Sequence, residues 1–307
     1  MKRTKIAIIG AGAVGSTTAY ALMLKNIAGE LLLVDINKEL CKGEVYDLSD
    51  ALPFCSTSKI RVGTYKDAAQ ADIIIIAAGK AQKPGQSRTE LLQANCSIMK
   101  HIITDMKPIQ PNAIIIVVTN PVDILALCVQ NVSNLDRSQI FGTGTFLDTQ
   151  RLRNIVSEKL RMAPQSIHAY VLGEHGDTQF AAWSTASIAG IPIKEFPEIT
   201  EKDLDTFAQE TKGRAYEIIK YKGSTHFGIA TCVAAMCENI VYNTKRILPL
   251  SVYSEEFKVC FSMPVVLGES GIEQILPPPL NEKEQLQLEK TATHLQETAK
   301  ENGLNKK

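Results

Sequence analysis

The chain has 307 residues, with 33 basic and 33 acidic side chains, so its formal net charge is zero. A neutral chain has no overall field that would draw it onto nucleic acid, and no apolar stretch approaches the roughly 18 residues of a membrane span. We therefore expect no nucleic-acid partner and no membrane association. Seven cysteines without a CxxC pair, and an N-terminus that lacks a signal-peptide cleavage site, predict reduced thiols in a cytoplasmic protein.

Short apolar runs alternate with helical patterns over the first 140 or so residues. The runs are nearly continuously apolar, as expected for strands that are covered on both faces. This strand–helix order predicts an α/β fold with a doubly wound parallel sheet, the Rossmann arrangement. The expected strands are Lys5 to Ile9, Leu31 to Ile36, Ile73 to Ala78 and Ile114 to Thr119, with helices at Val14 to Leu24 and Thr89 to Met106.

The pattern changes after Gly142, where we place the boundary between a cofactor-binding domain (1–142) and an α+β substrate or catalytic domain (143–307). No repeat or low-complexity linker separates the two. The elements expected in the second domain are helices at Leu147 to Leu160, Glu201 to Lys220, Phe227 to Arg246 and Glu282 to Asn302, a strand in SIHAYVLG, and a β-rich stretch from Val252 to Leu267.

A glycine motif lies between the first strand and the first helix. Gly10, Gly12 and Gly15 fit G-x-G-x-x-G, which is weak alone but informative in this position. The first glycine allows a tight turn, the second lets the backbone approach a pyrophosphate, and the third packs helix on strand. Asp35 ends the next strand, where a carboxylate binds the ribose diol of NAD and repels the extra phosphate of NADP. The alternative is an ordinary turn with Asp35 as a helix cap. We favour NAD as the cofactor, and we expect no metal.

A histidine and an Asp–Arg pair are candidates for the chemistry. His175 lies between glycines in GEHGDT, directly after an apolar segment, and histidine suits reversible proton transfer near neutral pH. Asp148 and Arg151 are three residues apart and so share one helix face, which offers the histidine an acceptor and a carboxylate a planar fork. The alternatives are a structural histidine and a surface ion pair.

With these residues in place, the sequence resembles the lactate/malate dehydrogenase family over its whole length. The matching segments are GAGAVG, LLLVD, AAGKAQKPGQSR, VVTNPVD, LDTQRLR, GEHGDT and KGSTHFGIA.

The resemblance implies roles for individual positions. His175 is expected to be the acid/base, Asp148 to orient it, and Arg151 to bind the substrate carboxylate. Arg88 is expected to polarise the carbonyl once a lid at Lys80 to Arg88 closes. The substrate-binding residues implied are Gln82, Arg88, Asn120, Arg151 and Thr225, with a cis bond between Asn120 and Pro121. The cofactor-binding residues expected are Gly10, Gly12, Val14, Gly15, Asp35, Ala78, Gly79, Asn120 and Ile229.

Gln82 in GKAQKPG indicates which 2-hydroxy acid is used. Malate dehydrogenases of the family carry an arginine there, which pairs with a second carboxylate. A neutral amide cannot do so, and the expected reaction is hydride transfer between NADH and pyruvate to give L-lactate. A bulkier 2-hydroxy acid, malate, and a non-catalytic NAD-binding homologue remain alternatives.

The family resemblance also raises the question of regulation. Arg153 and His168 match a pair that binds fructose 1,6-bisphosphate at a subunit interface in allosteric bacterial relatives. The same pair occurs in non-allosteric members, so an ordinary helix-surface arginine and strand histidine remain an equal alternative. A homotetramer is what the resemblance implies for assembly.

Overall fold

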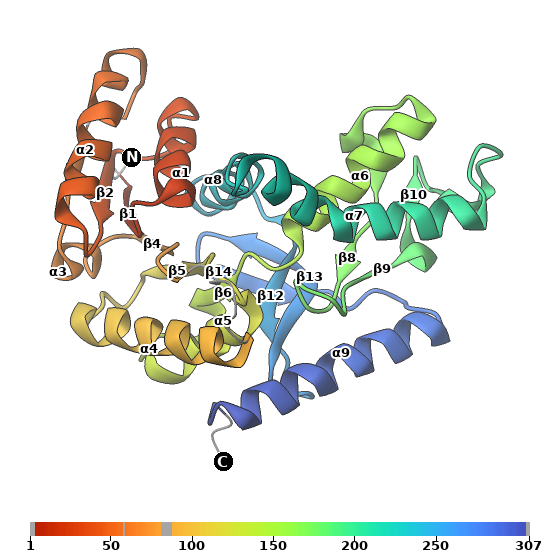
Figure 1. Cartoon of the computed structure of the whole chain (residues 1–307). Coiled ribbons are helices and arrows are strands. Elements are labelled where there is room, and N and C mark those ends of the chain that lie inside the picture. Colours follow the sequence, from red (N-terminus) through yellow and green to blue (C-terminus); the bar gives the residue numbers. More distant parts are fainter. Residues whose placement is uncertain (1–3, 58, 81–87, 305–307) are drawn as a thin grey trace.

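The computed structural model describes residues 4–57, 59–80 and 88–304, and it describes no side chain at position 88. Nine strands form one sheet, in the order β14-β13-β12-β6-β5-β4-β1-β2-β3 (Figure 1). Among the described residues, no helix is long and apolar enough to cross a membrane.

Six of the nine strands are parallel, and they include the four that the apolar runs predict. The chain winds outward from β1 to β3 and then returns to place β4, β5 and β6 on the other side of β1. This order defines the Rossmann arrangement, in which a ligand crevice opens outside the carboxyl ends of the strands where the winding reverses. The bounds are β1 Lys5–Ile9, β2 Glu30–Val34, β3 Lys59–Val62, β4 Ile73–Ile76, β5 Ile114–Val117 and β6 Ile140–Gly142.

Helices cover both faces of the sheet. On one face α1 packs against α8, and on the other α4 packs against α5, which also meets α9 (Figure 1). Strands β4 and β5, with the sequences IIII and IIIV, are buried on both faces between these layers. The bounds of the helices in this half are α1 Ala13–Leu24, α2 Lys38–Asp50, α3 Tyr65–Ala68, α4 Arg88–Met106 and α5 Val122–Val132.

Three antiparallel strands from the second half of the chain extend the same sheet. Strand β12 pairs with β6 through Ser251 and Gly142, and a Cβ added at Gly142 would lie 3.0 Å from that of Ser251. The helix predicted to run to Arg246 is wrong at its end. Helix α8 stops at Val241, because Asn243 and Lys245 adopt positive φ, and Arg246 begins β12. The bounds are α8 Phe227–Val241, β12 Arg246–Tyr253, β13 Cys260–Gly268, β14 Gly271–Ile275 and α9 Glu282–Glu301.

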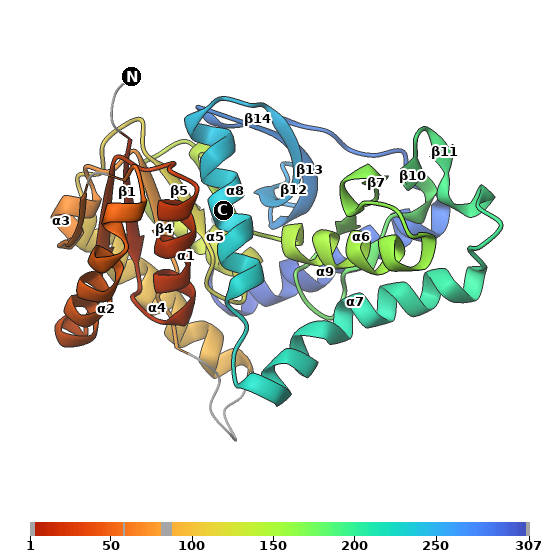
Figure 2. The ribbon, with the colours of Figure 1, turned by 90° about the horizontal axis from the view of Figure 1, so that it is seen from above.

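A second, smaller hydrophobic core lies at the far end of the molecule from β1–β3 (Figure 2). It includes Leu152, Ile167 and Phe207, whereas the main core runs through the nine-stranded sheet and its helices. The strand predicted in SIHAYVLG is divided here into β7 and β8. The bounds are α6 Phe146–Leu160, β7 Ile167–His168, β8 Val171–Leu172, β9 Phe180–Ala181, β10 Ser187–Ile188, β11 Ile191–Pro192 and α7 Glu201–Lys222.

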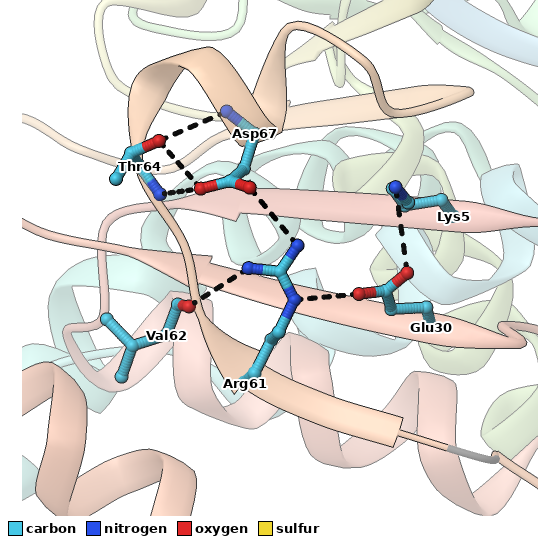
Figure 3. A network of polar contacts seen from close by, with 6 residues as sticks. All are labelled: Lys5, Glu30, Arg61, Val62, Thr64 and Asp67. Atoms are coloured by element: carbon cyan, nitrogen blue, oxygen red, sulfur yellow. Dashed lines mark hydrogen bonds and ion pairs between the residues drawn. The ribbon is translucent and has the colours of Figure 1, made fainter.

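The β3 edge of the sheet is tied to its neighbours by a charged network (Figure 3). Arg61 Nε donates to Glu30 Oε1 at 2.8 Å, and Arg61 NH2 donates to Asp67 Oδ1 at 3.2 Å. Asp67 also accepts hydrogen bonds from the side chain and backbone of Thr64, and together these contacts lower its pKa to about 2. The network links strands β2 and β3 to the start of α3, which faces the crevice.

Candidate active site

The glycine turn between β1 and α1 leaves one face of its backbone open. Gly10 has a φ of +107°, and a Cβ there would lie 2.6 Å from the backbone nitrogen of Ala78. A Cβ on Gly15 would lie 1.8 Å from the carbonyl oxygen of Gly10, whereas one on Gly12 would meet nothing within 4 Å. Gly10 and Gly15 therefore close the turn, and Gly12 faces open space at the N-terminus of α1, where an anionic group can approach the backbone.

Asp35, the residue after β2, is held against this turn. Its Oδ2 accepts a hydrogen bond from Ala11 N at 2.7 Å, and its Oδ1 accepts one from Asn37 N at 2.8 Å. The two bonds fix the direction of the carboxylate. An acceptor is thus fixed at the tip of the second strand, where the ribose of an adenine nucleotide would lie.

A cavity of about 690 Å³ follows the carboxyl ends of β1, β2 and β4. Gly10, Gly12 and Asp35 line it, together with Ala78 and Gly79. Its remaining walls are mostly apolar, which suits an adenine ring. The apolar lining residues from α2, α3 and α4 and the adjoining loop are Ile36, Leu40, Tyr65, Ala94, Ile98 and Ile102, and α4 adds the polar Ser97, His101 and Asp105. An open glycine, an anchored carboxylate and an apolar slot fit the adenosine diphosphate half of NAD.

His175, Asp148 and Arg151 converge, as the sequence interpretation requires. His175 Nδ1 lies 2.6 Å from Asp148 Oδ2, and Arg151 NH1 lies 3.1 Å from Asp148 Oδ1. The side chain of Asp148 is 3% exposed, that of Arg151 is 11% exposed and that of His175 is 24% exposed. A buried carboxylate thus has a cation bound to one oxygen and an imidazole to the other.

The surroundings of these groups favour their charged forms. Burial alone would raise the pKa of Asp148, but the charges and hydrogen bonds of His175 and Arg151 outweigh it and lower that pKa. Burial opposes the charging of His175, but the Asp148 carboxylate outweighs it and raises the pKa of the imidazole. The site therefore stabilises an imidazolium, which is the proton-donating form of histidine.

Local structure fixes this geometry. Asp148 and Arg151 lie in the first two turns of α6 at i and i+3, so both project from the same face. Gly173, with a φ of +85°, turns the chain after β8 and packs against Thr291 of α9. The backbone N–H of His175 then donates to Asp123 Oδ2 at 2.8 Å, which anchors the loop to α5.

Asn120 lies in the loop between β5 and α5. The predicted cis bond between Asn120 and Pro121 is present, and the Asn120 carbonyl accepts a hydrogen bond from Asn95 Nδ2 at 3.0 Å. Asn95, fully buried on α4, also accepts from Lys80 N at 2.8 Å. One amide therefore links the strand end that borders the cavity to the loop that carries Asn120.

The remaining predicted site residues have few described contacts that bear on their expected roles. Ile229 lies in the first turn of α8 and Val14 in that of α1, and both pack against the main core. Thr225, half-buried, precedes α8. Gln82 and most of the expected lid lie outside the described residues, and for Arg88 only the backbone, at the start of α4, is described.

The two residues of the expected anion-binding pair, Arg153 and His168, have different surroundings. Arg153 Nε donates to the Ala169 carbonyl at 3.1 Å, and its guanidinium lies 5.4 Å from the centre of the Tyr170 ring. Burial and the nearby charge of Arg246 lower the pKa of Arg153, and no described carboxylate pairs with it. His168, on β7, is exposed.

Sequence reasoning missed two buried residues that organise the site. Asp123 is 2% exposed and Asn95 is fully buried. Asp123 stands in the TNPVD segment, where a carboxylate within an otherwise apolar helix start is the signal that could have identified it. Asn95 has no such signal, because an asparagine in a helix is usually exposed.

Comparison with known proteins gives the family. Residues 4–142 match the lactate/malate dehydrogenase NAD binding domain, and residues 145–306 match the lactate/malate dehydrogenase alpha/beta C-terminal domain. The fold and the crevice define an NAD-binding dehydrogenase, and the chain belongs to the lactate/malate dehydrogenase family.

Relatives cover nearly the whole chain. L-lactate dehydrogenase A of Rhizopus oryzae is 46% identical over 95% of this chain and 91% of its own length. L-lactate dehydrogenase of Lacticaseibacillus casei is 41% identical over 95% and 92%. Among solved structures, a lactate dehydrogenase from a Medee basin deep-sea metagenome library has a TM-score of 0.95 at 36% identity, covering 99% of this chain and 100% of that one. The minor L-lactate dehydrogenase of Enterococcus mundtii has a TM-score of 0.95 at 34% identity, covering 98% of both chains.

Proposed function

We propose that this chain is an NAD-dependent L-lactate dehydrogenase that interconverts pyruvate and L-lactate. The observation that carries the proposal is the arrangement of His175 and Arg151 on the two oxygens of the buried Asp148, at 2.6 and 3.1 Å. The residues that line the glycine crevice fit NAD, which would supply the hydride when bound. In the proposed division of labour, residues 1–142 bind the cofactor and residues 143–307 supply the acid/base and the substrate clamp.

The contact with Asp148 indicates which ring nitrogen of His175 exchanges a proton with the substrate. Because His175 Nδ1 faces the Asp148 carboxylate, Nδ1–H donates to Asp148 and Nε2 is left to serve the substrate oxygen. Reduction of a keto group requires the protonated imidazole, which Asp148 stabilises. Oxidation of the alcohol requires the neutral form, which then accepts the hydroxyl proton.

Arg151 suits the substrate carboxylate. Its NH1 is bonded to Asp148, which fixes the guanidinium plane and leaves its remaining N–H groups for a second carboxylate. We propose that Asn120 and Thr225 complete the substrate pocket and that Arg88 polarises the carbonyl. Gln82, a neutral amide, is proposed to disfavour a second carboxylate on the substrate, so pyruvate is preferred to oxaloacetate.

A homotetramer is proposed, with support from exposed apolar side chains. Phe54 is 87% exposed and Phe227 is 66% exposed, and with Tyr20 they line one hollow beside α1 and α2. Apolar exposure of this kind on neighbouring elements is typical of subunit contacts. The seven free thiols favour a cytoplasmic location.

Binding of fructose 1,6-bisphosphate is a further proposal. Two guanidiniums, those of Arg153 and Arg246, lie near each other without a described carboxylate partner, and an anion would relieve their repulsion. Exposed His168 would add a third donor.

The test of this function is NADH absorbance followed with pyruvate, oxaloacetate and longer 2-keto acids, with and without fructose 1,6-bisphosphate. We expect kcat/KM to be highest for pyruvate, by about tenfold or more over a keto acid with a longer side chain. A preference for oxaloacetate would overturn the role given to Gln82. No NADH consumption with any keto acid would favour a non-catalytic homologue. An unchanged rate in the presence of fructose 1,6-bisphosphate would contradict its proposed role as an effector.

A further inference from the structure

We propose that Cys96 and Cys128 form an oxidisable dithiol, which hydrogen peroxide converts to a disulfide that shifts the loops beside the cofactor and substrate sites. The reaction proposed above uses neither thiol, so the pair is a modification site of its own. Its effect on turnover rests on the proposed function, whereas formation of the disulfide does not.

The two thiols meet where α4 packs against α5. Cys128 Sγ donates to the backbone carbonyl of Cys96 at 3.7 Å, and the two side chains share a hydrogen bond. Cys128 is fully buried and Cys96 is 6% exposed. Because the sulfurs are already in contact, a covalent bond between them needs only a further approach of the two helices at this point.

A cavity of about 330 Å³ gives a small molecule a route to the pair. Cys96 lines it, with Gln93 and Lys100 from the same helix and with Glu301 and Asn302 from the end of α9. A water molecule takes about 30 Å³ of liquid volume, so a molecule of hydrogen peroxide fits this space. The sulfur of Cys96 is therefore the one that peroxide meets first.

The surroundings of the pair favour one thiolate. The hydrogen bond from Cys96 lowers the pKa of Cys128 in spite of burial, and the Lys100 ammonium acts in the same direction. The same hydrogen bond, together with burial, raises the pKa of Cys96. The two thiols thus share one proton, and its movement to Cys128 leaves the charge on Cys96 beside the cavity. By contrast, burial raises the pKa of Cys232 to about 12, which keeps that thiol neutral and unreactive.

The oxidation consumes one peroxide for each pair. The Cys96 thiolate attacks one oxygen of hydrogen peroxide, the O–O bond breaks, and hydroxide leaves as the sulfur becomes a sulfenic acid. The Cys128 sulfur then attacks that sulfur, so that the S–S bond forms and the S–O bond breaks with loss of a second hydroxide. The protons of the two thiols convert both hydroxides to water. Two electrons have then passed from the sulfurs to the peroxide.

The disulfide would act on the proposed site through the residues on either side of Cys96. Asn95 accepts from the backbone of Lys80 at 2.8 Å and donates to that of Asn120 at 3.0 Å. Ser97 lines both the thiol cavity and the cofactor cavity. A bond that draws α4 toward α5 moves both residues, and with them the loop proposed to hold the substrate. Small displacements of a substrate-positioning group are costly to turnover.

The first experiment identifies the bond. The whole protein, with Cys55→Ser to remove a half-buried lone thiol, is treated with a small excess of hydrogen peroxide. The number of free thiols in the denatured protein should fall by two. Peptide mass spectrometry without reduction should find residues 96 and 128 in linked peptides, which dithiothreitol separates. Absence of this link, or a link between other cysteines in its place, would overturn the proposal.

The second experiment follows pyruvate-dependent NADH consumption before and after peroxide. We expect kcat/KM to fall by about tenfold on oxidation and to recover with dithiothreitol. Cys96→Ala, which removes the sulfur at the cavity, should keep the rate of its untreated form. A loss of rate that persists in Cys96→Ala, or a link that leaves the rate unchanged, would overturn the proposal.

Cys41→Ala is the matched control. Cys41 is fully buried and, like Cys128, donates to a backbone carbonyl, that of Leu33 at 3.4 Å. Its removal should leave the sensitivity to peroxide as it is in the parent protein, because the dithiol remains. Protection by Cys41→Ala equal to that by Cys96→Ala would overturn the assignment.

The two readouts also separate the dithiol from the proposed function. If no keto acid is reduced but residues 96 and 128 become linked reversibly, the proposed function fails and the dithiol stands. If pyruvate is reduced but the link does not form, the dithiol fails alone.

Discussion

At the scale of single residues, the proposed chemistry depends on one carboxylate that contacts both an imidazole and a guanidinium. Asp148 binds His175 through Oδ2 and Arg151 through Oδ1, and its side chain is 3% exposed. Little water reaches it, so each contact is stronger than it would be at the surface. The pKa of His175 is raised chiefly because this carboxylate offsets the effect of burial.

Substitution of Asp148 by asparagine tests that dependence. The folded pKa of His175 is raised, so the imidazolium dominates below it and is lost as pH rises through it. Without the carboxylate that pKa falls, and the high-pH limb of pyruvate reduction should move toward acid. We expect kcat at pH 7 to drop by about 100-fold or more, as measured by NADH absorbance. Asp203→Asn, which removes a half-buried partner of Lys159, should leave the profile unchanged. A limb that stays in place in Asp148→Asn would contradict the account.

The sequence predicted these three residues because their spacing and flanking glycines carry a chemical signal. Asp123 and Asn95 were not predicted, since each acts through backbone groups of distant segments, His175 in one case and Lys80 and Asn120 in the other. Only the fold brings those groups together.

At the scale of elements, the turn between β1 and α1 separates structural glycine from functional glycine. Gly15 contacts the Gly10 carbonyl so closely that no Cβ fits, whereas Gly12 faces open space. The sequence motif contains both glycines without separating their roles, whereas the structure shows that Gly15 is required for packing and Gly12 leaves the backbone accessible.

A pair of alanine substitutions measures the difference. Gly15→Ala should lower the free energy of unfolding by about 1–3 kcal/mol, because the overlap outweighs the gain in helix propensity. Gly12→Ala should change the free energy of unfolding by less than about 0.5 kcal/mol. It should weaken NADH binding tenfold or more, on the order of 1.4 kcal/mol, because the added methyl group blocks the approach of the cofactor to the backbone. Thermal unfolding and NADH fluorescence titration measure the two effects. Equal behaviour of the two variants would contradict this assignment.

Elements were predictable where periodicity is strong. Buried strands such as β4 and β5 follow from continuous apolar runs, and β1 from Lys5–Ile9 matches its prediction. The end of α8 was not predictable, because the polar residues after Val241 continue a helical pattern that Asn243 and Lys245 break by adopting positive φ. The two-residue strands β7 to β11 are too short for any period to appear.

At the scale of the whole molecule, one sheet joins the cofactor crevice to the loop that carries His175. Strand β12 continues the sheet beyond β6, and its Ser251 holds Asp123 beside His175. The exposed apolar residues Tyr20, Phe54 and Phe227 line a hollow beside α1 and α2, at positions that a second chain could cover.

Sedimentation tests the proposed assembly. At micromolar concentration the protein should have a mass near four chains of 33.6 kDa. Phe54→Asp should lower the sedimenting mass, because the added charge would be buried in the subunit contact. The control Ile275→Asp, in a 39% exposed position on β14, should leave the mass unchanged. A wild-type protein that sediments as a single chain would contradict the tetramer.

The central claim is that His175 delivers the proton while the crevice binds the cofactor independently. The most direct measurement compares His175→Asn with wild type in pyruvate-dependent NADH consumption and in NADH affinity by fluorescence. We expect a loss of about 1000-fold in kcat, with a Kd for NADH that changes by less than about twofold, or 0.4 kcal/mol. Retention of most of the turnover, or loss of both turnover and NADH binding, would contradict this claim.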